Sequence, residues 1–358
     1  MFEIETENYE NLKVALESLL AELKEIHNVQ LNTKTYKIQK MLGGDMKSLS
    51  LLMGIVSSSG VHTCCWCHCD VGARGTLEID RDWAIERTQL QAAQEWENDT
   101  NGYHNKPLID FIEYDCVVID LLHLLLRISD QLFNLLQEKL MTLDNDNSTN
   151  IDNRPMLKTF KTFLETECKI TKPFISSLRN TEMPIKFRSF SGSERSKIFI
   201  KIFENGQDFK DIFVNFEVSF IFENYVWKNF YNIYTKLKSL DNEDNTSVIE
   251  DYANYLRGEL KEWLEIYILL SAKDHITPYI HAFVFHMPDF LVKFKKINLY
   301  NVQGLEKLND IVTKNYHNST NKHRTDKIYL KQLLQKQNRI DFYDLFYSLF
   351  FKIINCLE

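Results

Sequence analysis

The sequence contains few of the residues that interrupt helices. Among 358 residues there are 11 glycines and 6 prolines. Turn-rich β architectures need both residue types in quantity, so this scarcity favours a mainly helical fold. Long apolar runs are also missing. The longest, CVVIDLLHLLLRI, is interrupted by Asp120 and His123 and is too short to cross a bilayer, so we expect no membrane span.

Basic charge is lacking over the chain as a whole. The net charge is −8, which excludes a surface that binds nucleic acid over its entire area. The first residues, MFEIETENYE, are acidic and polar, unlike a secretory signal. We therefore expect a reducing compartment, in which clustered cysteines bind metal more often than they form disulfides.

Apolar residues recur at helical spacing along most of the chain. They predict a helix over residues 11–26, a series of helices between residues 80 and 275, and a helix over 340–358. The middle series includes the segments IDRDWAIERTQLQAAQEWEN, VVIDLLHLLLRISDQLFNLLQEKLM, RSKIFIKIF, FIFENYVWKNFYNIYTKLKSL and SVIEDYANYLRGELKEWLEIYILLSA. Aromatic residues make up 13% of the chain, which predicts a large core.

One segment near the amino terminus follows a different pattern. The alternation in TKTYKIQKML predicts a strand over residues 33–42. Gly43 and Gly44 then predict a tight turn, and Asp45 stands before the helix MKSLSLLMGIV. A strand, a tight turn and an acid in front of a helix, in this order, would hold the acid at the carboxyl edge of a sheet. Taken alone, Asp45 is most simply a helix N-cap, a position that aspartate favours.

Four of the seven cysteines crowd into residues 64–69. Cys64 and Cys67 form a C-x-x-C motif, whose spacing lets two thiolates reach one zinc ion. The segment HITPYIHAFVFHMPDF offers His281 and His286 as two further ligands, provided that the helix ends or bends between them. A Cys₂His₂ site would join residues that are far apart in the sequence and would stabilise the fold by closing a long loop.

The identity of the four ligands stays open at this stage. Two spare thiols, Cys65 and Cys69, and two spare imidazoles, His62 and His68, lie close to the motif and could replace a predicted ligand. On spacing alone, the two distant histidines are also compatible with an ordinary pair in the core.

Positive charge is concentrated near the carboxyl terminus. Residues 291–340 hold eleven lysines and arginines against Glu306, Asp310 and Asp326, a local net charge of +8 in an acidic chain. Such a strip favours an anionic partner, and nucleic acid is the obvious candidate. A solvated basic helix is an equally good interpretation of the strip taken alone.

The order and intervals of these motifs resemble the catalytic core of the V(D)J recombination-activating recombinase and the related Transib-type transposases. The stretch GGDMKSLSLLMGIVSSSGVHTCCWC matches the family's aspartate, helix and C-x-x-C, with nineteen residues from Asp45 to Cys64. The family's H-x-x-x-x-H-x-P-E motif is similar to HAFVFHMPDF, with Asp289 in place of glutamate. Glu306 follows His286 by twenty residues, the position of the family's last catalytic glutamate, and EYDCVVIDLLHLL resembles a D-x-L-H element of the family.

The resemblance implies a ribonuclease H-like fold that acts on DNA in the nucleus. Asp45 and Glu306 would hold the catalytic magnesium or manganese ions, and Cys64, Cys67 and the two histidines would bind structural zinc. Relatives of this type act as homodimers or with a partner subunit. The candidate DNA contacts are Lys307, Lys314, Lys322, Arg324 and Lys327.

The sequence departs from the family at one point. The family's first catalytic aspartate lies further upstream of the second than the 44 residues that precede Asp45 allow. We therefore expect an incomplete DNA endonuclease or transposase site, and activity is uncertain. The alternative is a domesticated, non-catalytic zinc protein that binds DNA or another protein.

These observations together predict an α+β fold that is predominantly α. We expect a truncated ribonuclease H-like core interrupted by a large helical insertion and closed by a zinc clamp. Residues 1–70 would form the first part of the core, with the C-x-x-C motif. Residues 71–275 would form the insertion, and residues 276–358 would contribute the two histidines, an acidic helix and a basic tail.

Overall fold

The computed structural model describes residues 8–31, 33–57, 59–75, 85–145, 150–176, 185–271, 276–301 and residue 314. The chain divides into two compact units. One is Glu17–Asn301, and the other combines Met1–Leu16 with Val302–Glu358. Among the described helices, none has both the length and the apolar character needed to cross a membrane.

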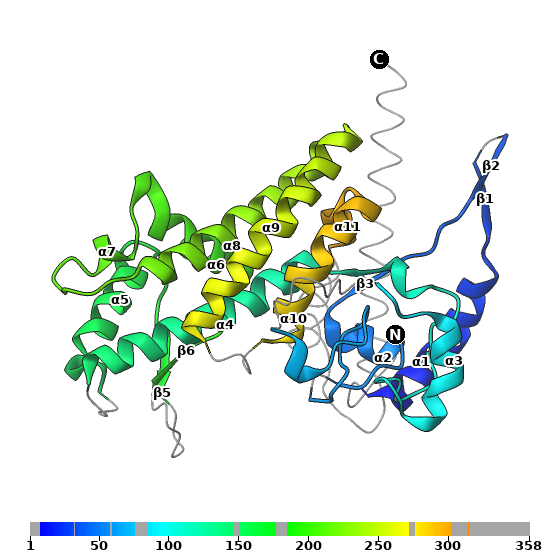
Figure 1. The fold of residues 1–358 in the computed structure, drawn as a ribbon, viewed down its shortest axis with the longest axis horizontal. Helices are drawn as coiled ribbons and strands as arrows, with labels where there is room; N and C mark the ends of the chain where they lie inside the picture. Colours follow the sequence, from blue (N-terminus) through cyan, green and yellow to red (C-terminus); the bar gives the residue numbers. More distant parts are fainter. Residues whose placement is uncertain are drawn as a thin grey trace. The chain divides into compact units, whose positions relative to one another are not determined.

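Helices dominate the described residues, as predicted (Figure 1). The longer ones coincide with the segments of helical apolar spacing, because each buries one apolar face. The helices are α1 (Tyr9–Glu25), α2 (Met46–Leu52), α3 (Gln89–Glu95), α4 (Leu121–Asp144), α5 (Pro155–Thr166), α6 (Gly192–Phe203), α7 (Phe209–Ile212), α8 (Ile221–Ser239), α9 (Thr246–Leu270), α10 (Pro278–His281) and α11 (Met287–Phe294).

The described strands are short and form three two-stranded sheets. An antiparallel ribbon joins β1 (Asn28–Leu31) to β2 (Lys34–Lys37), and a second antiparallel pair joins β5 (Phe174–Ser176) to β6 (Ile185–Phe187). The third sheet is parallel, between β3 (Leu42–Gly44) and β4 (Val117–Ile119). A parallel pair beside helices is compatible with a ribonuclease H-like core, but these sheets do not by themselves define that fold.

The parallel pair corrects two details of the sequence-based prediction. Gly43 and Gly44 lie in β3 rather than in a turn, and a Cβ on Gly43 would lie 3.2 Å from the carbonyl oxygen of Tyr300. The close approach of that backbone explains why glycine fits there. Val117, predicted to begin a helix, begins strand β4 instead, and the helix starts at Leu121. A short apolar run has no period that distinguishes the two structures.

The core is built by the helices of the middle of the chain. Helix α8 packs on α9, α9 packs on α11, and α4 packs on α5 and α6. Three tryptophans, Trp66, Trp227 and Trp263, are almost fully buried in this core. Buried Arg195 joins α6 to α4 by donating hydrogen bonds to Leu126 O and Ser129 Oγ. The metal-ligand candidates lie at the end of this core, where α10 and α11 meet the cysteine loop.

Candidate metal centre

Four side chains from distant parts of the sequence meet in the interior. The ligand atoms of Cys64, Cys67, His281 and His286 all lie within 4.8 Å of one another, and all four residues are buried. His286 Nε2 lies 3.3 Å from Cys64 Sγ, and His281 Nε2 lies 3.2 Å from Cys67 Sγ. In the described part of the chain, this is the one group of three or more such residues close enough to hold a metal ion.

The spacing of these atoms fits a tetrahedral zinc ion. With the usual Zn–S and Zn–N bond lengths, a tetrahedron separates a sulfur from a nitrogen by about 3.6 Å. The two observed sulfur–nitrogen distances, 3.3 and 3.2 Å, differ from that value by a few tenths of an ångström. Two thiolates and two imidazoles are also the donor set of structural zinc sites, which are closed to solvent.

A π-helical turn brings the two histidines to the same side of their helix. In an α-helix each residue turns by about 100°, so residues five apart point roughly 140° away from each other. Residues Ala282–His286 are π-helical, and the Met287 N–H bonds to the carbonyl of Ala282. The i→i+5 hydrogen bonding of a π-helix lengthens the turn by one residue, which brings residues five apart toward the same side. This turn is the bend that the sequence required between His281 and His286.

Buried Arg87 holds the backbone of the cysteine loop. Its Nε donates to the carbonyl oxygens of Cys64 at 2.8 Å and Cys67 at 3.1 Å, and its guanidinium lies 4.7 Å from the centre of the Tyr103 ring. The Arg87 guanidinium therefore orients the backbone of both cysteines from outside the metal site. Arg87 lies twenty residues past the motif, and nothing in the local sequence indicates this role.

Trp66, which lies between the two cysteines in the sequence, also anchors the cysteine loop. Its indole Nε1 donates to Val117 O on β4 at 2.9 Å, and its ring lies 5.0 Å from that of Phe290 and 5.6 Å from that of His286. Its place inside the C-x-x-C motif is the sequence feature that could have indicated a supporting role.

The spare thiols and imidazoles have other contacts. Cys65 Sγ lies 3.6 Å from Ser50 Oγ, Cys69 Sγ donates to Asp70 O, and His62 Nδ1 lies 2.9 Å from His68 O. None of them belongs to the group of four in the described structure.

Burial sets the protonation of the site. It raises the pKa of the Cys67 thiol to about 12 and lowers the pKa of His286. A neutral imidazole is the form that binds a metal. A bound divalent cation reverses the effect of burial on a thiol, because a coordinating thiol loses its proton.

The parallel strands place two aspartates at one edge. In the register Gly44 pairs with Ile119, so Asp45 and Asp120 both follow the carboxyl end of a paired strand. Asp45 N-caps α2, and its Oδ1 accepts from Ser48 N at 2.9 Å. Asp120 is fully buried, N-caps α4, and accepts from His123 N at 2.9 Å.

Asp120 also pairs with the side chain of His123. Asp120 Oδ2 lies 2.6 Å from His123 Nδ1.

Tyr279 connects this edge to the metal centre. Its hydroxyl accepts from the N–H of Met46, the first residue of α2, at 3.0 Å, and the residue stands two positions before His281. Burial raises the pKa of Tyr279 to about 12, and the negative charges of Asp45 and Asp120 raise it as well. The histidine segment is thereby fixed to the turn that carries Asp45.

Several predicted residues lie outside the described part of the chain. These are Glu306, Lys307, Lys322, Arg324 and Lys327, whereas Lys314 is described and exposed. Three lysines of the basic strip are already paired with acids of the described chain. Lys293, Lys295 and Lys296 form ion pairs with Asp115, Glu250 and Asp244, respectively. Asp289, the acid of the segment HAFVFHMPDF, pairs with Arg257 at 2.6 Å.

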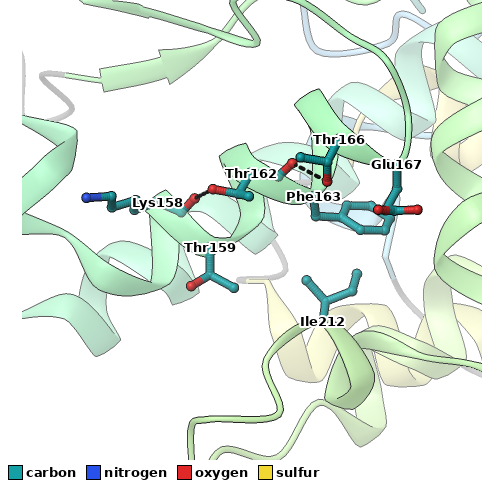
Figure 2. A pocket seen from close by; sticks show the side chains of 7 residues that line it. All are labelled: Lys158, Thr159, Thr162, Phe163, Thr166, Glu167 and Ile212. Carbon is teal, nitrogen blue, oxygen red and sulfur yellow. Dashed lines mark hydrogen bonds between the residues drawn. The ribbon is translucent and has the colours of Figure 1, made fainter.

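The surface depression drawn in Figure 2 does not resemble a substrate site. It measures about 410 Å³ and lies between α5 and Ile212 of α7. The hydroxyls of Thr162 and Thr166 donate to carbonyls of their own helix, at Lys158 and Thr162, rather than into the depression. Small-molecule sites need a few convergent polar groups. The remaining lining residues are Thr159, Phe163 and Glu167.

Comparison with known proteins adds no assignment, since neither a protein-family model nor a curated protein matches this chain.

Proposed function

We propose that this chain is the zinc-clamped core of a DNA-binding protein derived from Transib-type transposases and the V(D)J recombinase. Metal-dependent DNA cleavage by that core would depend on Asp45 and Glu306.

The meeting of the four metal-ligand candidates carries the proposal. Motif spacing in the sequence suggested Cys64, Cys67, His281 and His286, and the resemblance implied the same four, although Cys64 and His286 are 222 residues apart. A chance pair of motifs has no reason to meet in the interior with sulfur–nitrogen distances close to those of a zinc tetrahedron. Their proximity is therefore what an inherited clamp predicts.

The position of Asp45 also supports the proposal. Ligands of open parallel sheets bind beyond the carboxyl ends of the strands, and Asp45 stands at that edge. Its carboxylate is partly exposed and accepts from Ser48, which leaves lone pairs for a cation. A divalent cation there would polarise a phosphodiester and activate the attacking oxygen.

Other residues near this edge would serve to orient their neighbours. Buried Asp120 holds His123 Nδ1, which fixes the direction of an imidazole that is only 13% exposed. Tyr279 links the histidine segment to the start of α2. The zinc clamp would therefore also hold the carboxylate edge in place.

A second function is favoured by the same carboxylates. Asp45 is engaged as an N-cap and Asp120 is fully buried. The described residues therefore offer one accessible carboxylate at this edge. A protein that binds DNA through the basic strip, residues 291–340, without cutting it would need no further accessible carboxylate.

The test uses variants that separate capping from metal binding. Asn caps a helix about as well as Asp, so Asp45→Asn retains the cap and removes the negative charge, whereas Asp45→Ala loses both. We would measure nicking of supercoiled plasmid with Mn²⁺ for the wild type, Asp45→Asn, Glu306→Ala and the control Asp251→Ala, an exposed acid on α9.

Nicking by the wild type and the control that disappears in Asp45→Asn and Glu306→Ala would support the catalytic function. An Asp45→Asn protein that melts like the wild type would assign the loss to the charge rather than to the fold. DNA binding without nicking would favour the second function. A protein that neither binds DNA nor cuts it would refute both.

A further inference from the structure

An exposed β-ribbon precedes the carboxylate edge. Strands β1 and β2 pair over four residue pairs, from Asn28 with Lys37 to Leu31 with Lys34. Figure 1 shows this ribbon standing out from the helices around it. Residues 28–30 and 33–37 are all exposed. An isolated two-stranded ribbon is at best marginally stable in water, so a ribbon exposed on both faces is suited to packing against a partner.

The ribbon has a charge opposite to that of the chain. Residues 26–44 contain three lysines and no aspartate or glutamate, although the whole chain has a net charge of −8. Within the described residues, no acidic side chain pairs with Lys34 or Lys37. The third, Lys40, lies at the root of the ribbon, where it donates to Lys24 O and lies 5.0 Å from the Phe111 ring.

Three acids at the root of the ribbon have other partners. Asp110 pairs with Lys24 at 2.9 Å, and Asp115 pairs with Lys293. Glu113 accepts from Gln89 N at 3.2 Å. A fourth acid, Glu25, lines the same hollow as Lys37, whereas Lys34 lies at the far end of the ribbon.

The pairing register sorts the side chains of the ribbon onto two faces. Directly paired residues share a face, and the faces alternate along each strand. Asn28 with Lys37 and Gln30 with Thr35 therefore form one face that is wholly polar. The opposite face carries Val29 and Tyr36, which are 39% and 48% exposed, and Lys34, which pairs with Leu31 beside the turn.

We infer that the β1–β2 ribbon is a groove-binding element for double-stranded DNA, with its polar face directed at the bases. Asn28 and Gln30 would contact base edges, and Lys37, on the same face, would contact a phosphate. Lys34 lies on the opposite face beside the turn and would add to the positive charge that attracts DNA. The choice of DNA over other polyanions rests on the proposed function. The placement of the DNA contact on this ribbon rests on the exposure, the charge and the pairing register of the ribbon.

The dimensions and side chains fit this partner. The major groove of B-DNA is about 12 Å wide and admits a two-stranded β-ribbon. Asn and Gln can bond adenine through two hydrogen bonds, and lysines neutralise phosphates. The chain runs from β2 through four residues to β3 and on to Asp45, so DNA held by the ribbon would approach the carboxylate edge.

The test measures binding of the full chain to a fluorescein-labelled duplex of mixed sequence, about 30 base pairs long, by anisotropy over a series of salt concentrations. The test variant is Lys34→Gln/Lys37→Gln. The matched control is Lys228→Gln/Lys261→Gln, which removes the same charge from exposed positions on α8 and α9.

We expect the ribbon variant to bind about tenfold more weakly near 0.1 M salt and its salt slope to fall by about 1, because the phosphate contact of Lys37 is lost. The control should stay within about twofold of the wild type. A further variant, Asn28→Ala/Gln30→Ala, should leave the salt slope unchanged and reduce discrimination between duplexes of different sequence.

The outcomes separate the ribbon from the proposed function. Equal losses in the ribbon and control variants would overturn the ribbon assignment and leave DNA binding intact. Failure of the wild type to bind duplex at low salt would overturn the proposed function, and this inference with it. Tighter, ribbon-dependent binding to single-stranded RNA than to the duplex would overturn the assignment to DNA.

Discussion

Removing the Cys67 thiol is expected to destabilise the fold by more than the loss of one buried sulfur atom. Cys67 and His281 are 214 residues apart, and a shared metal ion closes the chain between them. The entropy of closing a loop of that length amounts to about 5 kcal/mol. Packing of Trp66 against β4 and α11 closes much of the same loop. We therefore expect Cys67→Ala to lower the free energy of unfolding by about 3 kcal/mol.

Cys65→Ala is the matched control, because it removes the same atom from a neighbouring buried site. We expect it to cost about 1 kcal/mol, the price of a small cavity, and to leave the metal in place. In a unit of this size the Cys67→Ala loss corresponds to a melting temperature lower by about 5–10 °C.

The assay combines thermal melts with a count of bound zinc per chain. Wild type and Cys65→Ala should contain one zinc and should melt earlier in the presence of a strong chelator. Cys67→Ala should contain less zinc and should respond little to the chelator. Equal melting of the two variants, or a wild type that contains no zinc and ignores the chelator, would refute the metal centre.

Three further predictions follow from other contacts. Arg87→Met should weaken zinc binding by about tenfold or more in a chelator competition, because two hydrogen bonds to the cysteine loop disappear. Arg188 lowers the pKa of Glu194 from 4.5 to about 2, so this ion pair stabilises the fold above pH 4.5 and is lost as the pH falls toward 2. Glu194→Gln should therefore cost about 1 kcal/mol at pH 7 in urea melts, and nothing near pH 2. Gly258→Ala, inside α9 with no atom near the added Cβ, should raise the free energy of unfolding by about 0.5–1 kcal/mol in the same melts.

The sequence alone determined the helices that bury one long apolar face. The predicted segment 11–26 corresponds to α1, and the long segments of the middle correspond to α4, α6, α8 and α9. Their period of about 3.6 residues is a local property, so no distant contact is needed to detect it. Sequence also indicated that Asp45 would cap a helix, because the preference of aspartate for that position depends only on its neighbours.

Contacts between distant segments decided the remaining features. Val117 belongs to a strand because Leu42 lies beside it, a pairing that no local pattern reveals. The C-x-x-C spacing indicates two metal ligands, but the π-helical turn at Ala282–His286 is what places both histidines on one side. Arg87 reaches the cysteine loop from twenty residues away. A metal site needs several donor atoms at one point in space, and sequence spacing fixes distances along the chain but not the path by which the chain returns.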